Sequence, residues 1–206
     1  AIGSQADRQR AFIGAMHVVS GAKAHDMARH APPGAATRLL DIGGASGSFT
    51  IAYLQASAAL RATLFDLPPV VELARQRLAE NGLLERVELV AGDFYADDLP
   101  GGHDLALLSA IIHQNSREQN VALYRKVLEA LLPGGRLLIR DHVLAPDRTS
   151  PRPGALFAVN MLCATPGGNS YTLAEISEDL TSAGFERVKL VHPDTQMDGI
   201  VEAWRP

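Results

Sequence analysis

The sequence is short of several residue types. Its 206 residues include one cysteine, one tryptophan and only 5% aromatic residues. A lone Cys163 cannot form an internal disulfide, and its apolar neighbours predict a small core residue. The longest apolar runs, at 105–112 and 137–139, are strand-sized and far shorter than the roughly 18 residues of a membrane-spanning helix. Disulfide scaffolds and membrane-spanning chains are excluded, and we expect a cytoplasmic protein without a membrane partner.

Neither sign of charge is in large excess. The 19 Lys and Arg residues stand against 23 Asp and Glu residues, a net charge of −4. Broad nucleic-acid binding needs clustered Lys and Arg to neutralise phosphates, and the sequence has no such cluster. No H-E-x-x-H motif, cysteine pair or suitably spaced acidic triplet occurs, so no metal site is predicted. A small-molecule partner, and no nucleic acid, fits this composition.

Short apolar runs alternate with helical patterns along most of the chain, after a first helix at 5–30 that ends at Pro32-Pro33-Gly34. This alternation is typical of an α/β fold, a mostly parallel sheet with helices on both faces, in which ligands bind beyond the carboxyl ends of the strands. Two closely spaced late strands predict an antiparallel edge hairpin. Strands are predicted at 38–42, 61–65, 87–90, 104–110, 135–140, 185–191 and 199–204, and helices at 46–56, 69–81, 116–132, 154–163 and 173–183.

A glycine-rich loop follows the first predicted strand. The run Asp41-Ile42-Gly43-Gly44-Ala45-Ser46-Gly47 leads into a helix for which Ser46 is the expected cap. Glycines there let the backbone approach a nucleotide-like ligand beside a helix N-terminus. A dinucleotide fingerprint ending at Gly47 would need glycine at position 42, which is Ile42, so hydride transfer with NAD is the weaker alternative.

Each of the first three predicted strands ends in an acid: Asp41, then Asp66, then Asp93. A carboxylate at Asp66 can accept two hydrogen bonds from a ribose diol. One at Asp93 can accept from an adenine amino group, with Phe94 beside the purine ring. A single aspartate after a strand is commonly a capping residue, but three in succession indicate one ligand laid across the strand ends.

The glycine loop resembles the first motif of class I S-adenosylmethionine-dependent methyltransferases. The segments Phe65-Asp66-Leu67-Pro68, Gly92-Asp93-Phe94 and Ile111-Ile112-His113 narrow the resemblance to the plant-type small-molecule O-methyltransferases and their bacterial relatives. Further turns at 133–135, 165–168 and 183–185 fall in that family's order, so the resemblance covers nearly the whole chain. It implies a Rossmann-like, seven-stranded fold and methyl transfer from S-adenosylmethionine to a hydroxyl of a small, aromatic or polyketide-like acceptor.

The resemblance also implies roles for individual residues. The positions that match the family's cofactor site are Ser20, Asp41, Gly43, Gly44, Gly47, Asp66, Leu67, Asp93, Phe94 and Ser109. The positions that match its acceptor pocket are Phe12, Met16, Met161 and Thr165, although the spacing of Phe12 and Met16 also fits the buried stripe of a helix.

His113 matches the family's general base, which takes a proton from the acceptor hydroxyl, and Asp141 matches an acid that orients it. Imidazole suits the role because it is largely neutral at pH 7 and releases a proton readily. A cap or a salt bridge with Arg140 or Arg148 is an equally weighted alternative for Asp141. Among the other histidines, His142 and His17 are possible pocket residues.

The chain departs from the family at Gln114 and Asn115, where relatives carry Asp and Trp. It also departs at Ser170, where relatives carry a glutamate. Because of these departures, the alternative hypothesis is a cofactor-binding domain of the same family that is non-methylating or regulatory. By domain, we expect residues 1–33 to form a helix and linker packed on a cofactor-binding domain at 34–206. The family's N-terminal dimerisation domain is expected to be absent from this chain, and the full-length protein to be a homodimer.

Overall fold

The structure is a computed structural model that describes residues 21–206. The roles predicted for Phe12, Met16 and Ser20 lie outside these residues. Residues 21–30 are helical, as the predicted first helix requires, and the Pro32-Pro33 turn follows. This helix packs onto the domain through Ala24 and Met27, which are buried in one of its two cores.

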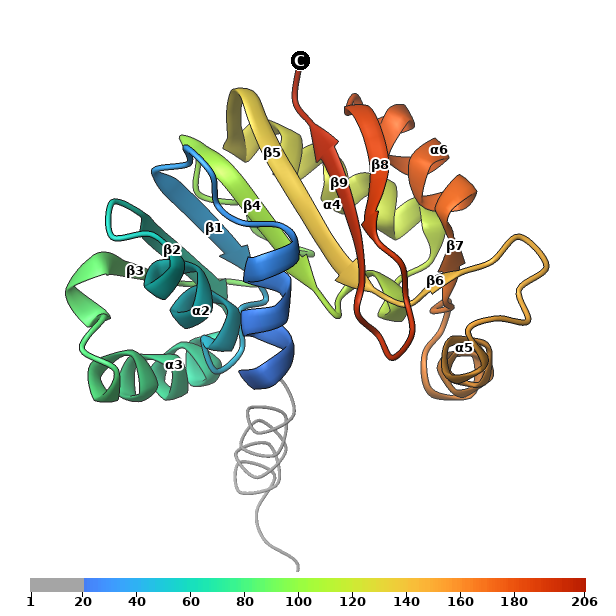
Figure 1. The fold of residues 1–206 in the computed structure, drawn as a ribbon, viewed down its shortest axis with the longest axis horizontal. Coiled ribbons are helices and arrows are strands. Elements are labelled where there is room, and N and C mark those ends of the chain that lie inside the picture. Colours follow the sequence, from blue (N-terminus) through green and yellow to red (C-terminus); the bar gives the residue numbers. More distant parts are fainter. Residues whose placement is uncertain (1–20) are drawn as a thin grey trace, which may run out of the picture.

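Seven strands form one sheet in the order β3-β2-β1-β4-β5-β9-β8 (Figure 1). The pairs from β3 to β5 are parallel, and β9 pairs antiparallel with both β5 and β8. This arrangement confirms the predicted fold class and its antiparallel edge. The strands are β1 (Arg38–Ile42), β2 (Arg61–Asp66), β3 (Val87–Ala91), β4 (His103–Ser109), β5 (Leu131–Asp141), β8 (Glu186–His192) and β9 (Gly199–Trp204).

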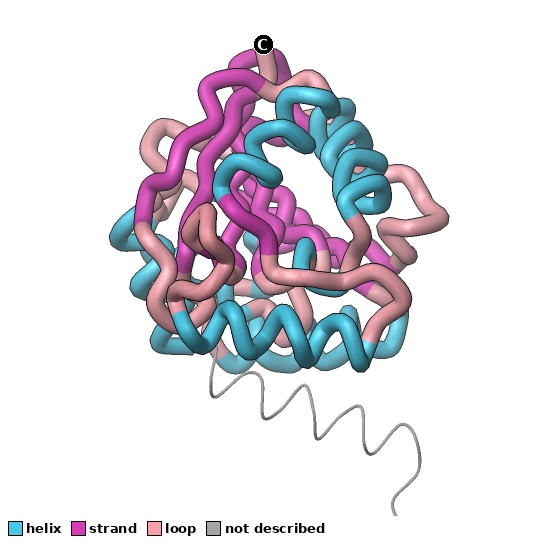
Figure 2. Tube along the Cα trace, turned by 90° about the vertical axis from the view of Figure 1, so that its right-hand side faces the viewer, coloured by secondary structure: helices cyan, strands magenta, loops and turns pink. Residues whose placement is uncertain are grey.

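Helices cover both faces of the sheet, as the edge-on view in Figure 2 shows. A second, two-stranded parallel sheet pairs β6 (Val143–Leu144) with β7 (Tyr171–Thr172) beyond the end of β5. The helices are α2 (Ser48–Ala56), α3 (Pro68–Glu80), α4 (Arg117–Ala130), α5 (Arg152–Ala164) and α6 (Leu173–Ala183), with 3-10 turns η1 (Leu84–Arg86) and η2 (Ile112–Gln114).

Two apolar cores lie on opposite faces of the sheet, because successive strand side chains point to opposite sides. On β1, Leu39 belongs to the core beneath the 21–30 helix and α2, whereas Leu40 belongs to the core beneath α4 and α6. On β4, Leu107 and Leu108 divide in the same way. Strands buried on both faces read as continuous apolar runs, which is why the sequence predicts them well.

Two local expectations are wrong, and one strand begins a residue earlier than predicted. The N-cap of α2 is Gly47, with φ 79° and no side-chain cap, rather than Ser46, because the loop turns through a left-handed residue just before the helix. Cys163 is exposed on α5 rather than in a core, because only one face of α5 packs on the protein. His103, one residue before the strand predicted at 104–110, is the first residue of β4; it is buried, with Nε2 2.9 Å from Thr63 Oγ1.

Candidate active site

The glycine loop lies at the carboxyl end of β1 and is fixed to the end of β2. Gly43 N–H donates to the Phe65 carbonyl at 2.8 Å. Gly43 has φ +67°, and a Cβ there would lie 2.6 Å from Ile111 Cδ1. A Cβ on Gly44 would lie 2.7 Å from Leu64 Cγ. Neither position therefore has room for a side chain, and the backbone of these two residues is open to a ligand at the start of α2.

Asp41 lies beneath this loop rather than on its surface. The residue is 1% exposed, and Oδ2 accepts hydrogen bonds from Thr50 N at 3.1 Å and Thr50 Oγ1 at 2.6 Å. Burial raises the pKa of Asp41 to about 6, although the Thr50 hydrogen bonds act in the opposite direction. This position fits the supporting role that the resemblance implies, in which the acid holds the loop against the first turn of α2.

Asp66 joins the second strand to the same loop. Its Oδ2 accepts from Ala45 N at 2.8 Å, and its Oδ1 accepts from Leu67 N at 2.7 Å. Burial raises the pKa of this carboxyl, and these two backbone N–H groups oppose the rise. Each oxygen has a further lone pair, so the fixed carboxylate can still accept hydrogen bonds from a diol. Leu67, beside it, is 43% exposed.

Asp93 and Phe94 lie after β3, close to the glycine loop. Asp93 Oδ1 accepts from Tyr95 N at 2.9 Å, while the side chain stays partly exposed. Phe94 packs on the core and would lie 3.7 Å from a Cβ on Gly43. The structure thus brings Asp66, Phe94 and the loop to one end of the sheet, as the sequence predicts from the strand order.

His113 and Asp141 form a hydrogen-bonded pair at this same end of the sheet. His113 Nδ1 lies 2.9 Å from both Asp141 Oδ1 and Oδ2. The Asp141 side chain is 1% exposed and that of His113 is 13% exposed. Burial alone would raise the pKa of Asp141, but His113 and the His142 N–H that donates to Oδ1 lower it overall. Asp141 is therefore ionised at neutral pH and fixes the ring through Nδ1, with Nε2 on the side away from the acid.

The salt bridges expected as alternatives for Asp141 are not formed. Arg148 pairs instead with Glu175, at 2.6 Å. Arg140 forms no ion pair with a described residue, and its Nη1 donates to Ser109 Oγ at 3.1 Å. Ser109, another predicted cofactor residue, is thereby connected to β5.

A second histidine–carboxylate pair lies beside the first. His142 Nδ1 lies 2.7 Å from Asp194 Oδ2, and both side chains are buried. The ring of Phe157 on α5 contacts both histidines, edge-on to His113 with centroids 4.9 Å apart and tilted to His142 at 5.2 Å. Neither Phe157 nor Asp194 is predicted from the sequence. The available signal for Phe157 was its place one helical turn before Met161, a predicted pocket residue.

The predicted acceptor residues in the described part of the chain lie at the end of α5. Met161 is partly buried, and its carbonyl accepts from Thr165 Oγ1 at 2.9 Å. Thr165 Oγ1 also accepts from Gly168 N at 2.7 Å. The Thr165 hydroxyl thus stabilises the turn after α5. The groups that remain available to contact a ligand are the Thr165 methyl group and the Met161 side chain.

The family departures have structural partners. Asn115 is fully buried, with Nδ2 donating to Asn120 Oδ1 at 3.0 Å and Oδ1 accepting from Tyr95 Oη at 2.5 Å. Ser170 is buried, and its Oγ donates to the Gly154 carbonyl at 3.0 Å. Neither residue takes over the role of an acid beside His113.

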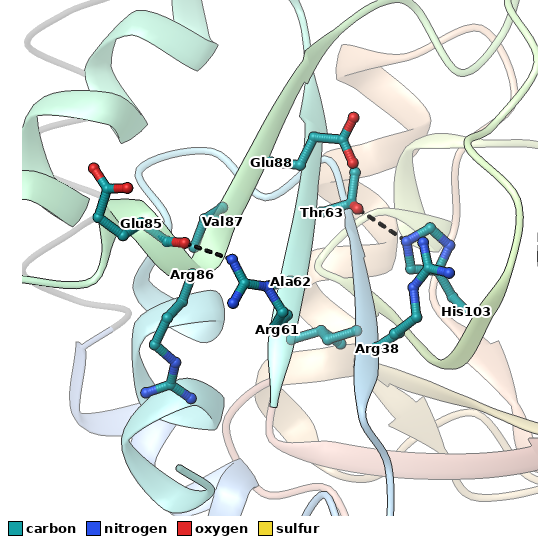
Figure 3. A pocket seen from close by; sticks show the side chains of 10 residues that line it. Arg38, Arg61, Ala62, Thr63, Glu85, Arg86, Val87, Glu88 and His103 are labelled. Atoms are coloured by element: carbon teal, nitrogen blue, oxygen red, sulfur yellow. Dashed lines mark hydrogen bonds between the residues drawn. The ribbon is translucent and has the colours of Figure 1, made fainter. Parts of the chain in front are cut away.

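Within residues 21–206, no group of three or more His, Cys, Asp or Glu side chains is placed to hold a metal ion. No helix of this part of the chain is long and apolar enough to cross a membrane. A hollow of about 410 Å³ lies at the opposite end of the sheet, around Arg38, Arg61 and His103 (Figure 3). None of the predicted site residues lines it, so the chemistry expected from the sequence belongs to the carboxyl ends of the strands.

Comparison with known proteins gives consistent results. The model of a family described as "O-methyltransferase domain" matches residues 1–186. The chain is 35% identical over 187 residues to 3-hydroxy-5-methyl-1-naphthoate 3-O-methyltransferase of Streptomyces sahachiroi, covering 91% of this chain and 54% of that protein. It is 33% identical to the tetracenomycin polyketide synthesis 8-O-methyl transferase TcmO of Streptomyces glaucescens, covering 90% of this chain and 56% of that protein.

A solved structure, "PigF with SAH", superposes with a TM-score of 0.86 at 26% identity, covering 98% of this chain and 59% of that one. PigF of Serratia sp. (strain ATCC 39006) is named an S-adenosyl-L-methionine-dependent methyl transferase and is 29% identical over 74% of this chain and 44% of that protein. The chain spans about half the length of the curated relatives it matches.

Proposed function

Since this chain belongs to the O-methyltransferase domain family, we propose that it carries the methyl-transfer site of an S-adenosylmethionine-dependent O-methyltransferase. Its acceptor is a hydroxyl group on a small aromatic or polyketide-like molecule. The observation that carries the proposal is that the His113–Asp141 pair lies at the same sheet end as the glycine loop and the acids at the strand ends. A surface suited to a nucleoside and a proton acceptor thus lie together at the carboxyl ends of the strands.

The residues present fit the cofactor. At Gly43 and Gly44 a Cβ would collide with Ile111 and Leu64, so glycine at both positions keeps the loop in this conformation, beside the start of α2 where the cofactor would bind. Asp66 would hold the ribose, and Asp93 with Phe94 the adenine. When bound, S-adenosylmethionine supplies an electrophilic methyl group on a positively charged sulfur. PigF, solved with SAH, supports this assignment.

His113 is the general base in this mechanism. Asp141 accepts the Nδ1–H, which fixes the tautomer in which Nε2 is unprotonated and can take the hydroxyl proton. As the proton moves to Nε2, the buried carboxylate stabilises the imidazolium that forms. With the cofactor bound, the pair would take the hydroxyl proton as the methyl group passes from sulfur to oxygen, and His113 would release that proton to water afterwards.

Phe157 and Met161 of α5 form an apolar wall for an aromatic acceptor. Phe157 already stacks edge-on to the base, so a flat acceptor resting against it would have its hydroxyl near His113. The naphthoate and tetracenomycin polyketide in the names of the two Streptomyces relatives are acceptors of this chemical class.

The test combines binding with turnover. Titration calorimetry with S-adenosylmethionine and its demethylated product measures cofactor binding, and mass spectrometry follows methylation of a panel of phenols, hydroxynaphthoates and polycyclic hydroxyquinones. One methylated product supports the proposal. Absence of binding to either cofactor form would overturn it, and tight binding without any methylated product would favour the regulatory alternative.

We also propose that the full-length protein is a homodimer. In support, α5 exposes Leu156, Val159 and Leu162, with relative exposures of 61%, 59% and 67%. Apolar side chains gathered along one helix face are typical of a surface covered by another protein element. Light scattering on the full-length protein tests this, and a monomer at all concentrations would contradict it.

A further inference from the structure

The buried pair of His142 and Asp194 has no part in the proposed mechanism. His142 Nδ1 lies 2.7 Å from Asp194 Oδ2, and the two side chains are 5% and 0% exposed. Asp194 Oδ2 also accepts from Val143 N at 3.2 Å, and Asp194 Oδ1 accepts from Asp198 N at 3.0 Å. The Asp194 carboxyl is thus held by three partners, and it in turn fixes the orientation of the His142 ring.

Helix α5 rests on the His142 ring at two successive turns. At the first turn, a Cβ on Gly154 would lie 3.1 Å from His142 Nδ1 and 2.9 Å from Leu144 Cδ2, so glycine allows the close approach of the helix. One turn later, the Phe157 ring is tilted against the His142 ring, with the centroids 5.2 Å apart. Both contacts lie on one face of the helix, because residues three apart in a helix are neighbours.

Few other contacts determine where α5 lies. The helix lies beyond the strand ends, apart from the helices that cover the sheet (Figure 1). Within Arg152–Ala164, Gly154 is the only buried residue, and its carbonyl accepts from Ser170 Oγ at 3.0 Å. An element with so little buried surface depends strongly on each contact that it makes. The His142 ring is therefore a main support of the part of α5 that carries Phe157.

Phe157 in turn connects the two histidines. Asp141 and His142 are adjacent in the chain, yet Asp141 bonds to His113 whereas His142 bonds to Asp194. The two histidine–carboxyl pairs are therefore separate networks, and the Phe157 ring contacts both, with its centroid 4.9 Å from that of His113. A shift of Phe157 would move an acceptor resting on it relative to His113, and methyl transfer requires close alignment of the reacting atoms.

We propose that His142 and Asp194 form a positioning pair, which holds Phe157 where an aromatic acceptor presents its hydroxyl to His113. The proposal rests on the proposed function for the identity of the reaction. The pair acts through Phe157 and does not itself contact the acceptor. Acceptor binding, but not cofactor binding, thus depends on a carboxyl in the loop between β8 and β9.

The decisive variant is His142→Asn. Asparagine places its side-chain amide nitrogen where His142 Nδ1 lies, so it keeps a donor for Asp194 and removes the ring that contacts Phe157. In steady-state kinetics, we expect the KM for a hydroxynaphthoate that the wild-type protein methylates to rise about 5- to 10-fold. The Kd for S-adenosylhomocysteine, measured by calorimetry, should stay unchanged. His103→Asn is the matched control, because His103 is similarly buried at the opposite end of the sheet, and it should change neither quantity.

Further variants separate positioning from other roles. Asp194→Ala should raise the same KM because nothing then fixes the His142 ring, whereas Asp194→Asn should retain most of the affinity because its amide oxygen can still accept from Nδ1. Combining His142→Asn with Phe157→Ala should raise the KM no further than Phe157→Ala alone, since His142 acts through Phe157. Additive effects in the double variant would overturn the proposal. So would an unchanged KM in His142→Asn, or a loss of cofactor affinity as large as the loss of acceptor affinity.

A fluorescent reporter tests the same contact without turnover. Phe157→Trp in a Trp204→Phe background places the single tryptophan of the chain on the acceptor wall. Adding His142→Asn should shift its emission to longer wavelength, because the ring loses its support and meets more water, and adding His103→Asn should not. An emission spectrum that His142→Asn leaves unchanged contradicts the positioning pair alone. A wild-type protein that binds no S-adenosylhomocysteine and methylates no acceptor contradicts the proposed function itself.

Discussion

His113 Nδ1 is equidistant, at 2.9 Å, from the two carboxylate oxygens of Asp141, so one acid fixes the ring in a single tautomer. Replacing the ring should remove proton transfer without disturbing cofactor binding. For His113→Ala we expect kcat/KM to fall roughly 10²- to 10⁴-fold with the S-adenosylhomocysteine Kd unchanged. Asp141→Asn should give a smaller loss in the same direction. Asp147→Asn, an exposed acid, is the control, and an unaffected rate in His113→Ala would remove His113 from the base role.

The two loop glycines provide a test of the cofactor cradle. A Cβ at Gly44 would lie 2.7 Å from Leu64 Cγ and 3.1 Å from Asp41 Cγ, whereas a Cβ at Gly101 meets nothing within 4 Å. Gly44→Ala should therefore lower the free energy of unfolding by about 1 to 3 kcal/mol and weaken cofactor binding, because the loop must shift. Gly101→Ala should change neither quantity. Chemical denaturation and calorimetry on both variants measure the contrast, and equal behaviour would contradict it.

The buried carboxyl of Asp41 predicts a pH dependence of stability. Its pKa is raised to about 6 in the folded protein, against about 3.9 in an unfolded chain, so folding favours the protonated form. Its contribution to stability is complete below about pH 4 and is lost as the pH rises through 6. The free energy of unfolding of Asp41→Asn relative to wild type should therefore increase by about 2 to 3 kcal/mol from pH 4 to pH 7.

Urea titrations of both proteins at several pH values measure that difference, because contributions from the other acids are shared and cancel. Thr50→Val removes a hydroxyl that donates to the Asp41 carboxylate and should move the loss of stability to higher pH. A difference between Asp41→Asn and wild type that does not vary with pH would show that Asp41 ionises normally.

Phe157 contacts His113 and belongs to the proposed acceptor wall, so its removal should affect acceptor binding and not cofactor binding. Phe157→Ala is expected to raise the acceptor KM about 10-fold, since a lost aromatic contact with its buried area is worth roughly 1 to 2 kcal/mol. Leu132→Ala, which removes an apolar side chain that is 45% exposed and lies outside α5, is the control. Steady-state kinetics with varied acceptor decide the point, and an unchanged KM would place the acceptor elsewhere.

The sequence predicts the sheet because its parallel strands are buried on both faces and so form continuous apolar runs. The bounds of α6 are also predicted, because a capping box at Thr172 and a left-handed Gly184 mark its two ends. The β6–β7 pair is missed, since two-residue strands carry no periodic signal. Cys163 is misplaced because α5 is apolar around most of its circumference, and periodicity then does not identify the buried face.

Residues of the candidate site also differ in whether the local sequence predicts them. The acids at the strand ends could be predicted from the sequence alone, because an aspartate that directly follows an apolar run is a local sequence pattern. Asp194 and Phe157 could not be predicted, since their place in the site depends on neighbours more than 10 positions away in the sequence: His142 for the first and His113 for the second.

The insertion of β9 between β5 and β8 has a consequence for biosynthesis. β5 spans eleven residues, and its outer edge is paired by Gly199–Trp204, which leave the ribosome long after β5 itself. Until then the nascent chain presents an open strand edge beside an apolar core, the kind of edge on which chains aggregate. The glycine loop can take its place at the ends of β1 and β2 early, but the open edge of β5 is covered only when β9 pairs with it.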